Sequence, residues 1–331
     1  VALSTIINLP LSEIYEVATF YAHFNIVKDS KDYNPVNVVR VCESLTCELF
    51  GAHKLLQDIK KLENKNIKVV PGPCMGRCNV APTVCVGKNY VDEANFHKVK
   101  KTIDEKNFDP FIPDYINLSS YKKNGGYEIA NKIKNGVISK KQVLDSLNES
   151  GLKGKGGAGF PTGKKWEIVS NYNGKKYVAV NGDEGEPGTF KDRSYLESDP
   201  HRFLEGALIA SYFINAQKVY IYMRDEYPTV IKILLDEINK MEDEEIIPKD
   251  FFIVRRGAGA YICGEESAMI ESIEGKRGLP RHRPPYVAEI GLFGCPTLTN
   301  NLETLFWVRD IIEKGAKWFA EKGSNGNKGF H

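Results

Sequence analysis

The hydrophobic positions of this chain follow helical and strand-like spacings in alternation. In residues 1–34 apolar side chains recur every three to four positions behind Pro10, which predicts a helical segment. Residues 36–105 instead contain short β-branched runs that end in turns, with helical patterns between them. Strands are expected at 37–41, 67–70 and 83–86, and helices after Cys47 and at 95–103. This order predicts a small α/β domain.

A second α/β domain is predicted beyond a polar segment. Residues 106–126 are rich in Pro, Ser, Asn and Gly and are typical of a linker. Residues 127–310 again alternate strands with helices, and residues 311–331 begin a further region. Strands are expected at 177–180, 218–222 and 251–254, and helices at 139–150, 164–170, 202–213 and 229–240. A last helix is expected to open on capping residues at 299–304.

Composition and charge narrow the class of partner. With 331 residues, 42% of them hydrophobic, the chain is long enough for two packed cores. Its net charge of +2 gives no argument for nucleic acid, and it has no apolar run of membrane length. The N-terminus lacks the layout of a signal peptide, so we expect a cytoplasmic protein without membrane insertion. Since the chain lacks an initial Met and a helix-ending signal, we expect a fragment.

The segment 151–166 is the strongest candidate for a ligand site. It combines six glycines with four lysines, and glycines let consecutive N–H groups converge on phosphate oxygens. A flexible linker is the alternative, although linkers are usually rich in Gly and Ser. Gly154, Gly156 and Gly159 fit G-x-G-x-x-G, but a helix is expected before them instead of a strand. The segment therefore predicts a phosphate cradle outside an ordinary Rossmann domain.

Two acidic turns follow predicted strands of the second domain. Asp183, Glu184 and Glu186 lie in the glycine-rich turn 181–193, where carboxylates are suited to accept from ribose hydroxyls and amide N–H groups. A solvated acidic turn is the alternative. Glu265 and Glu266 end a second glycine-rich turn at an expected helix start, and helix capping alone would explain that pair.

Four of the seven cysteines form two spaced pairs. Cys42 and Cys47 are separated by four residues and Cys74 and Cys78 by three, and each pair follows a predicted strand. Four thiolates in short loops hold an iron–sulfur cluster or zinc. The spacing favours a [2Fe-2S] cluster over zinc, which more often uses C-x2-C pairs, and a disulfide in a cytoplasmic protein is less expected still. Cys85 falls inside an apolar strand and is expected to be structural.

The cysteine segments resemble a known family. The residues 20–24 (FYAHF), 41–47 (VCESLTC) and 73–82 (PCMGRCNVAP) are similar to the thioredoxin-like [2Fe-2S] ferredoxin subunit of NADH-oxidising complexes. The resemblance implies that Cys42, Cys47, Cys74 and Cys78 ligate one cluster. It also implies a shortened N-terminal helical segment at 1–34 and a thioredoxin-like domain at 36–105.

The second domain resembles the FMN-containing, NADH-oxidising subunit of the same complexes. The resemblance rests on the segments 151–166, 181–193, 257–266 and 296–304. It implies an FMN- and NADH-binding domain at 127–310. The FMN residues it implies are Gly154, Gly156, Gly157, Lys165, Asn181, Asp183, Tyr261, Gly264, Asn300, Asn301 and Thr304. The NADH residues it implies are Phe160, Glu186, Glu266, Arg283 and Tyr286, with Phe160 and Tyr286 stacking on rings. Relatives often carry Lys and Phe at positions 283 and 286 and a basic residue at 295, so contacts there are expected to differ.

Together the two resemblances imply the electron-entry module of a multisubunit oxidoreductase, in which the flavin carries the chemistry and no side chain acts as acid or base. The family continues into a domain with a [4Fe-4S] cluster, which is expected beyond this chain. Fusion of both domains, with the segment 277–308, looks most like the β subunit of a soluble NAD-dependent formate dehydrogenase, whose partner is a catalytic α subunit. The alternatives are the diaphorase subunit of an NAD-reducing hydrogenase, the flavoprotein of NADH-quinone oxidoreductase, a zinc- and nucleotide-binding module without redox activity, and a flavin-free NAD dehydrogenase.

Overall fold

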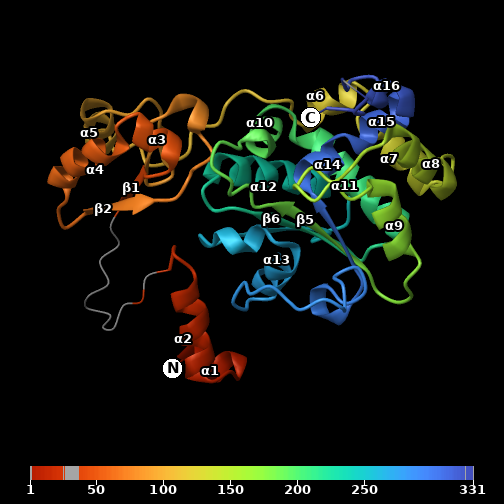
Figure 1. Cartoon of the computed structure of the whole chain (residues 1–331), viewed down its shortest axis with the longest axis horizontal. Helices are drawn as coiled ribbons and strands as arrows, with labels where there is room; N and C mark the ends of the chain where they lie inside the picture. The colour runs from red at the N-terminus through yellow and green to blue at the C-terminus, as the bar shows by residue number, and fades with distance from the viewer. Residues whose placement is uncertain (1, 25, 27–36, 325, 331) are drawn as a thin grey trace.

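The chain is built around two four-stranded sheets, one in each α/β domain (Figure 1). The computed structural model describes residues 2–24, 26, 37–324 and 326–330. The α/β class predicted from the sequence is confirmed, with the cysteine-containing domain first along the chain. The first sheet is mixed, whereas the second contains parallel strands alone.

The first sheet has the strand order β2-β1-β3-β4. Strands β1 and β2 are parallel, whereas β1 pairs with β3 and β3 pairs with β4 in antiparallel fashion. The strands are β1 (Asn37–Cys42), β2 (Ile67–Gly72), β3 (Val84–Val86) and β4 (Asn89–Val91), and the helices are α3 (Leu45–Leu49), α4 (Ala52–Ile59) and α5 (Phe96–Asp104). Strand β4 was not predicted, because its three residues are too short to show an alternation.

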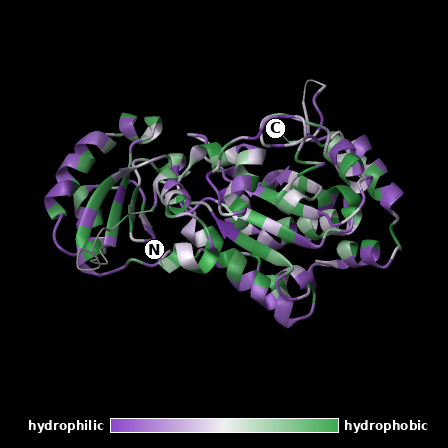
Figure 2. Ribbon diagram, turned by 90° about the horizontal axis from the view of Figure 1, so that it is seen from below, coloured by the Kyte–Doolittle hydropathy of each residue, from purple (hydrophilic) through white to green (hydrophobic). Residues whose placement is uncertain are grey.

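The second sheet is entirely parallel, in the order β7-β6-β5-β8. Its strands are β5 (Tyr177–Gly182), β6 (Lys218–Met223), β7 (Phe252–Arg256) and β8 (Thr297–Asn301). Helices α11 (Pro200–Ile214) and α12 (Pro228–Asp243) cover one face, and α13 (Glu266–Ile273) covers the other (Figure 1). Hydropathy follows this layering, since the strands are mostly hydrophobic and the outer helix faces are hydrophilic (Figure 2).

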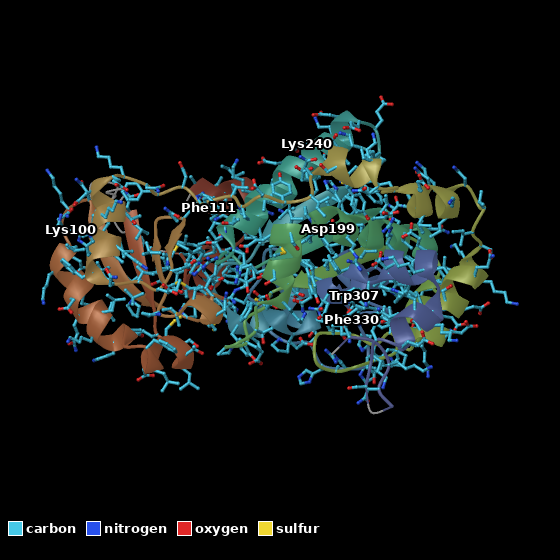
Figure 3. All side chains as sticks on the ribbon, turned by 90° about the horizontal axis from the view of Figure 1, so that it is seen from above. Lys100, Phe111, Asp199, Lys240, Trp307 and Phe330 are labelled. Atoms are coloured by element: carbon cyan, nitrogen blue, oxygen red, sulfur yellow. The ribbon has the colours of Figure 1, made fainter. Side chains whose placement is uncertain are left out.

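The remaining helices surround this second core. They are α6 (Leu118–Lys123), α7 (Glu128–Lys134), α8 (Lys140–Ser150), α9 (Thr162–Ser170), α10 (Lys191–Ser198), α14 (Leu302–Phe306), α15 (Val308–Lys314) and α16 (Ala316–Ala320). Near the end of the described chain, Phe330 stacks on Trp307 with ring centroids 4.2 Å apart (Figure 3). The backbone carbonyl of Phe330 also accepts a hydrogen bond from Lys155 in the glycine-rich loop.

The expected last helix begins later than the sequence indicated. Thr299 and Asn300 belong to strand β8, and only Asn301 acts as a cap, accepting from the N–H of Glu303 at 3.1 Å. The run Thr-Asn-Asn looked like a capping motif, but tertiary pairing with β5 keeps it extended. Polar residues are tolerated in this buried strand because their side chains are hydrogen-bonded, as Thr299 is to Glu266 at 2.6 Å.

The segment predicted as a linker is packed in its second half. Helix α6 buries Leu118 and Tyr121, and the Tyr121 hydroxyl donates to Glu205 of α11 at 2.7 Å. The N–H of Leu118 donates to Glu237 of α12 at 2.9 Å. These two hydrogen bonds hold residues 117–126 on the second domain. They also supply the buried carboxylates of Glu205 and Glu237 with the partners that buried polar groups need.

The N-terminal segment forms two helices and packs on the second domain. Helices α1 (Ala2–Ile7) and α2 (Leu11–Phe20) are separated by Asn8, whose φ is +53°. The Tyr21 hydroxyl donates to Ser272 at 2.9 Å and to the carbonyl of Lys276 at 2.7 Å. The helical segment predicted over 1–34 is thus interrupted at Asn8 and is helical as far as Phe20, and its part at 25 and 27–34 lies outside the described residues.

Candidate cofactor sites

The second sheet reverses its strand order beside β5. From β5 the chain proceeds to β6 and β7 on one side, and it returns as β8 on the other side. Open parallel sheets bind ligands outside the carboxyl ends of their strands at such a reversal. Asn181 near the end of β5 pairs in register with Asn301 at the end of β8. The predicted FMN residues Asn181, Asn300 and Asn301 therefore meet at the point where a ligand is expected.

The glycine-rich loop lies against this edge. Two backbone hydrogen bonds close the base of this loop. They run from Gly154 N–H to Phe160 O at 2.9 Å and from Thr162 N–H to Leu152 O at 3.0 Å. Gly157 has a φ of +115°, which L side chains rarely adopt. A Cβ atom on Gly156 would lie 3.3 Å from Cβ of Asn301, so glycine permits the close approach. The N–H of Lys155 donates to the hydroxyl of Thr304 at 3.0 Å, which joins the loop to α14.

Helix α9 brings Lys165 to the same edge. Its ammonium donates to Thr299 at 2.8 Å and to Glu266 at 3.0 Å. The neighbouring Trp166 is fully buried and donates its indole N–H to Asn300 at 2.9 Å. Burial acts to raise the pKa of Glu266, but the Lys165 charge and the Thr299 hydrogen bond outweigh it and hold that pKa below its usual value. Glu266 is therefore a carboxylate at neutral pH.

Asn181 positions both acidic turns around the site. Its amide oxygen accepts from the N–H of Asp183 at 3.1 Å, and its amide nitrogen donates to the carbonyl of Gly264 at 2.7 Å. Oδ2 of Asp183 is buried and has no hydrogen-bond partner among the described residues. Burial raises the pKa of Asp183 to about 7, against the opposing charge of Arg224. An unpaired buried acceptor at this edge fits a ligand with N–H groups, such as the flavin ring.

Three of the predicted NADH residues contact predicted flavin residues or one another. The Tyr261 hydroxyl donates to Glu186, and Arg283 pairs with Glu265 and lies 3.5 Å from Glu266. Phe160 and Tyr286 are 44% and 57% exposed, which leaves both rings accessible for stacking. The structure thus brings Glu266 and Arg283 together with the predicted flavin residue Lys165. It places Phe160 and Tyr286 on exposed segments.

Glu184, which was proposed for ligand recognition, and Glu265 both bond to the starts of helices in the protein itself. Glu184 is buried and accepts from the N–H groups of Asp192 and Arg193 at 2.9 and 3.3 Å, at the start of α10. It also accepts from the Tyr227 hydroxyl at 2.9 Å. Glu265 accepts from the N–H of Ser267 and of Ala268 at 2.9 Å and caps α13. Glu184 is therefore occupied as a helix cap, and the capping interpretation of Glu265 is confirmed.

One cation at the flavin edge was missed. Lys191 donates to Asn301 at 3.2 Å and to Asp192 at 2.7 Å, and it lies 3.1 Å from Glu303. Although burial opposes it, the two acidic neighbours raise the pKa of Lys191, so it stays charged. The signal was present in the sequence, because Lys191 lies within the acidic turn 181–193. Its partner Glu303 was not distinguishable from an ordinary first-turn acidic residue.

The four paired cysteines converge in the first domain. Cys42 ends β1, Cys47 lies on α3, and Cys74 and Cys78 flank the turn after β2, with their sulfurs 3.5 Å apart. The thiols crowd one another: contact with Cys42, and then burial, raise the pKa of Cys74 to about 12. A bound cationic cluster would relieve this crowding by taking up the thiolates. Within the described residues, no group of three or more Cys, His, Asp or Glu side chains is arranged around a single metal position.

The other cysteines lie apart from this quartet. Cys85 is buried in β3 and donates to the carbonyl of Gly87 at 3.4 Å, in agreement with a structural role. Cys263 is buried beside α13, and Cys295 precedes β8. Cys85, Cys263 and Cys295 therefore lie outside the group of four paired cysteines.

A cluster-type cysteine site beside a flavin-type phosphate cradle defines the chain as an iron–sulfur flavoprotein module. Comparison with known proteins gives the particular families. Residues 1–107 match the thioredoxin-like [2Fe-2S] ferredoxin family, and residues 147–310 match the Nuo51 FMN-binding domain family. The chain is a fusion of a domain from each family, and the families name FMN and [2Fe-2S] as their cofactors.

Curated relatives match about two thirds of the chain. The F subunit of NADH-quinone oxidoreductase from Aquifex aeolicus is 47% identical over 211 residues, which are 61% of this chain and 49% of the relative. The second F subunit of the same enzyme in Rhizobium meliloti is 45% identical over 227 residues, covering 66% and 54%. The chain thus spans about half the length of the curated relatives it matches.

A solved structure matches both domains together. The NAD+-reducing [NiFe]-hydrogenase in its air-oxidised state is similar over 99% of this chain and 60% of that chain, with a TM-score of 0.84 and 28% identity. The similarity includes the relative placement of the two domains, since one superposition covers nearly the whole chain. Among the described residues, no helix is long and apolar enough to cross a membrane.

Proposed function

We propose that this chain is an electron-entry module that passes electrons between NAD(H), FMN and iron–sulfur clusters. The observation that carries the proposal is the meeting of the glycine-rich loop, Lys165 and Asn301 at the strand-order reversal, beside a domain with four converging cysteines. FMN, when bound, exchanges a hydride with the nicotinamide and single electrons with the clusters. The [4Fe-4S] cluster of the family stays a prediction for the longer protein, as does the cytoplasmic location.

In this proposal the side chains and backbone of the protein bind and orient FMN and NADH, and they set the charge of the site. The loop N–H groups and Lys165 hold the phosphate, while Asp183 and Asn181 face the flavin ring. The remaining FMN residues are Gly154, Gly156, Gly157, Tyr261, Gly264, Asn300, Asn301 and Thr304. Phe160, Glu186, Glu266, Arg283 and Tyr286 receive NADH. Cys42, Cys47, Cys74 and Cys78 bind the [2Fe-2S] cluster.

The first test is the spectrum and activity of the purified protein. We expect absorption of both a flavin and a [2Fe-2S] cluster after anaerobic preparation, and reduction of an artificial acceptor by NADH. A colourless protein that binds zinc and nucleotide would support the binding-module alternative. A flavin-free protein that reduces a carbonyl substrate would support the dehydrogenase alternative.

For the parent enzyme we propose a soluble NAD-dependent formate dehydrogenase, in which this chain is the β subunit and the partner is a catalytic α subunit. The support is the fused domain order and the resemblance of residues 277–308. A second candidate is the diaphorase subunit of an NAD-reducing hydrogenase, which the fused structural neighbour favours. The third is the flavoprotein of a NADH-quinone oxidoreductase, whose F subunit is the curated relative.

The parent enzyme is identified by isolating the intact complex through a tag on this chain. NAD+ reduction is then assayed with formate and with hydrogen, and NADH oxidation is assayed with quinone. Formate-dependent activity alone is the expected result. Material that is silent with formate and active with hydrogen would overturn the formate assignment while leaving the module proposal intact.

A further inference from the structure

The acidic turn of the flavin domain contacts the cysteine loop directly. The N–H of Gly188 donates to the sulfur of Cys78 at 3.3 Å, although the two residues belong to different domains. Five residues further along, Arg193 donates to the carbonyl of Gly76 at 3.0 Å and to the Asn79 side chain at 3.3 Å. The same turn contains Glu186, which is proposed to receive the nucleotide. Glu186 lies two positions before Gly188, whose N–H donates to the predicted cluster ligand Cys78. A nucleotide bound at Glu186 would therefore be close along the chain to this contact.

The side chain of Arg224 connects the cysteine loop to the acidic turn. It follows β6 and is 4% exposed. One arm of its guanidinium donates to the backbone carbonyl of Cys74 and the other to that of Glu184. The planar fork of arginine can bridge two carbonyls in this way, whereas a lysine offers a single point of charge.

The surroundings of Arg224 leave it little freedom. Its guanidinium lies 5.1 Å from the ring centroid of Tyr227, whose hydroxyl donates to the side chain of Glu184 at 2.9 Å. Gly76 of the cysteine loop faces the same ring, and a Cβ atom there would lie 2.1 Å from the Tyr227 hydroxyl. The cysteine loop is therefore seated on Arg224 and Tyr227 without room for a side chain at Gly76.

The guanidinium of Arg224 donates directly to the cysteine loop, because its Nη2 bonds to the carbonyl of Cys74. The carboxylate of Glu226 lies 3.4 Å from Nε of the same guanidinium. In a buried site a fixed cation favours the more negative redox state of a neighbouring group, because the local dielectric constant is low. Arg224 is thus placed to stabilise the reduced form of a cluster held by Cys74.

We propose that Arg224 is a positioning residue that ties the cysteine loop to the acidic turn, raises the reduction potential of the [2Fe-2S] cluster and makes that potential sensitive to bound nucleotide. The inference rests on the proposed cofactors and adds a coupling between the nucleotide and cluster sites. Arg224 acts through the carbonyls of Cys74 and Glu184, and Gly188 forms the second link through the sulfur of Cys78.

The test is a redox titration of the cluster, followed by EPR, in wild type and in Arg224→Gln, Arg224→Lys and Arg202→Gln. Arg202 is the matched control, because it is a partly buried, ion-paired arginine of α11 whose partner is Asp310. For R224Q we expect at least a tenfold lower ratio of reduced to oxidised cluster at a fixed potential, which is a shift of about 59 mV towards more negative values. R224K and R202Q should stay near the wild-type value. An unshifted potential in folded R224Q would overturn the charge assignment.

The nucleotide link is tested with ADP-ribose, which cannot accept a hydride. Binding is measured by calorimetry, and the cluster potential and g-values are measured with and without the ligand. We expect ADP-ribose to shift the wild-type potential to more negative values and the R224K potential by less than half as much. Since R224K keeps the charge, this comparison remains available where R224Q does not fold. Absence of ADP-ribose binding would contradict the nucleotide site itself, whereas binding with equal shifts in both proteins would overturn the coupling.

Discussion

Lys165 and Glu266 form an ion pair 3.0 Å long, although the first is assigned to FMN and the second to NADH. Thr299, in the middle of β8, bonds to both residues of the pair. The two proposed ligand sites therefore share one charged contact. A phosphate that takes up Lys165 also changes the electrostatic environment of Glu266.

Replacing Lys165 by Met should weaken FMN binding roughly 10- to 100-fold, because a hydrogen bond to a charged group contributes about 1.5–3 kcal/mol. FMN affinity is measured by fluorescence quenching during reconstitution. Lys164→Met is the control, because Lys164 is the exposed neighbour on the same helix. Equal losses in both variants would indicate a general charge effect and not a phosphate contact.

Replacing Cys74 by Ser should remove the [2Fe-2S] EPR signal and leave FMN bound, because the two sites lie in separate domains. Iron content and flavin content are measured on the same anaerobic sample. Cys295→Ser, outside the quartet, should keep both. If the wild type contains zinc and no iron, the cluster assignment fails.

The sequence predicted the elements that carry strong local patterns. The β-branched runs that became β1, β5 and β6 are near-continuous apolar strands, and Ser139 caps α8 through a capping box. The convergence of four cysteines followed from their positions after strand ends. The strands and the helix cap depend on contacts between near neighbours in the chain, whereas the two cysteine pairs meet because β1 and β2 are adjacent in the sheet.

Features that depend on distant contacts were not predictable. The sequence of β8 is polar and does not look like a buried strand. It is buried because Thr299 and Asn300 bond to Glu266 and Trp166, which are more than 30 residues away in the chain. From the sequence, Glu184 was interpreted as a ligand-binding carboxylate. The fold shows instead that it accepts hydrogen bonds from the start of α10 and from Tyr227. No single-sequence pattern encodes the contact between Gly188 and Cys78, since 110 residues separate them.

Replacing Glu186 by Ala should loosen the selectivity for NADH over NADPH. Glu186 and Glu266 would both repel a 2′-phosphate, and removing one carboxylate removes part of that discrimination. The measurement is the ratio of kcat/KM for the two nucleotides, and an increase in NADPH use by roughly tenfold corresponds to about 1.4 kcal/mol. Glu289→Ala, an exposed acidic control, should leave the ratio unchanged. A wild type that already oxidises NADPH as well as NADH would sink this prediction.

Asp183 should make the stability of the cofactor-free protein depend on pH. Its pKa is raised to about 7 by burial, whereas an aspartate in the unfolded chain has a pKa of about 3.9. Between these values the unfolded chain has lost the proton that the folded chain still holds. Stability therefore falls as pH rises through this window, and the loss is complete above the folded-state pKa.

Asp183→Asn removes the titration and keeps the shape of the side chain. We expect the variant to be more stable than wild type by about 2–4 kcal/mol at pH 8, with a difference that shrinks as the pH is lowered to about 5. Urea unfolding of FMN-free protein at several pH values measures this difference. The same variant should bind FMN more weakly, because the unpaired oxygen Oδ2 is the acceptor offered to the flavin. A stability difference that is constant across this pH range would show that Asp183 does not titrate within it and would contradict the raised pKa.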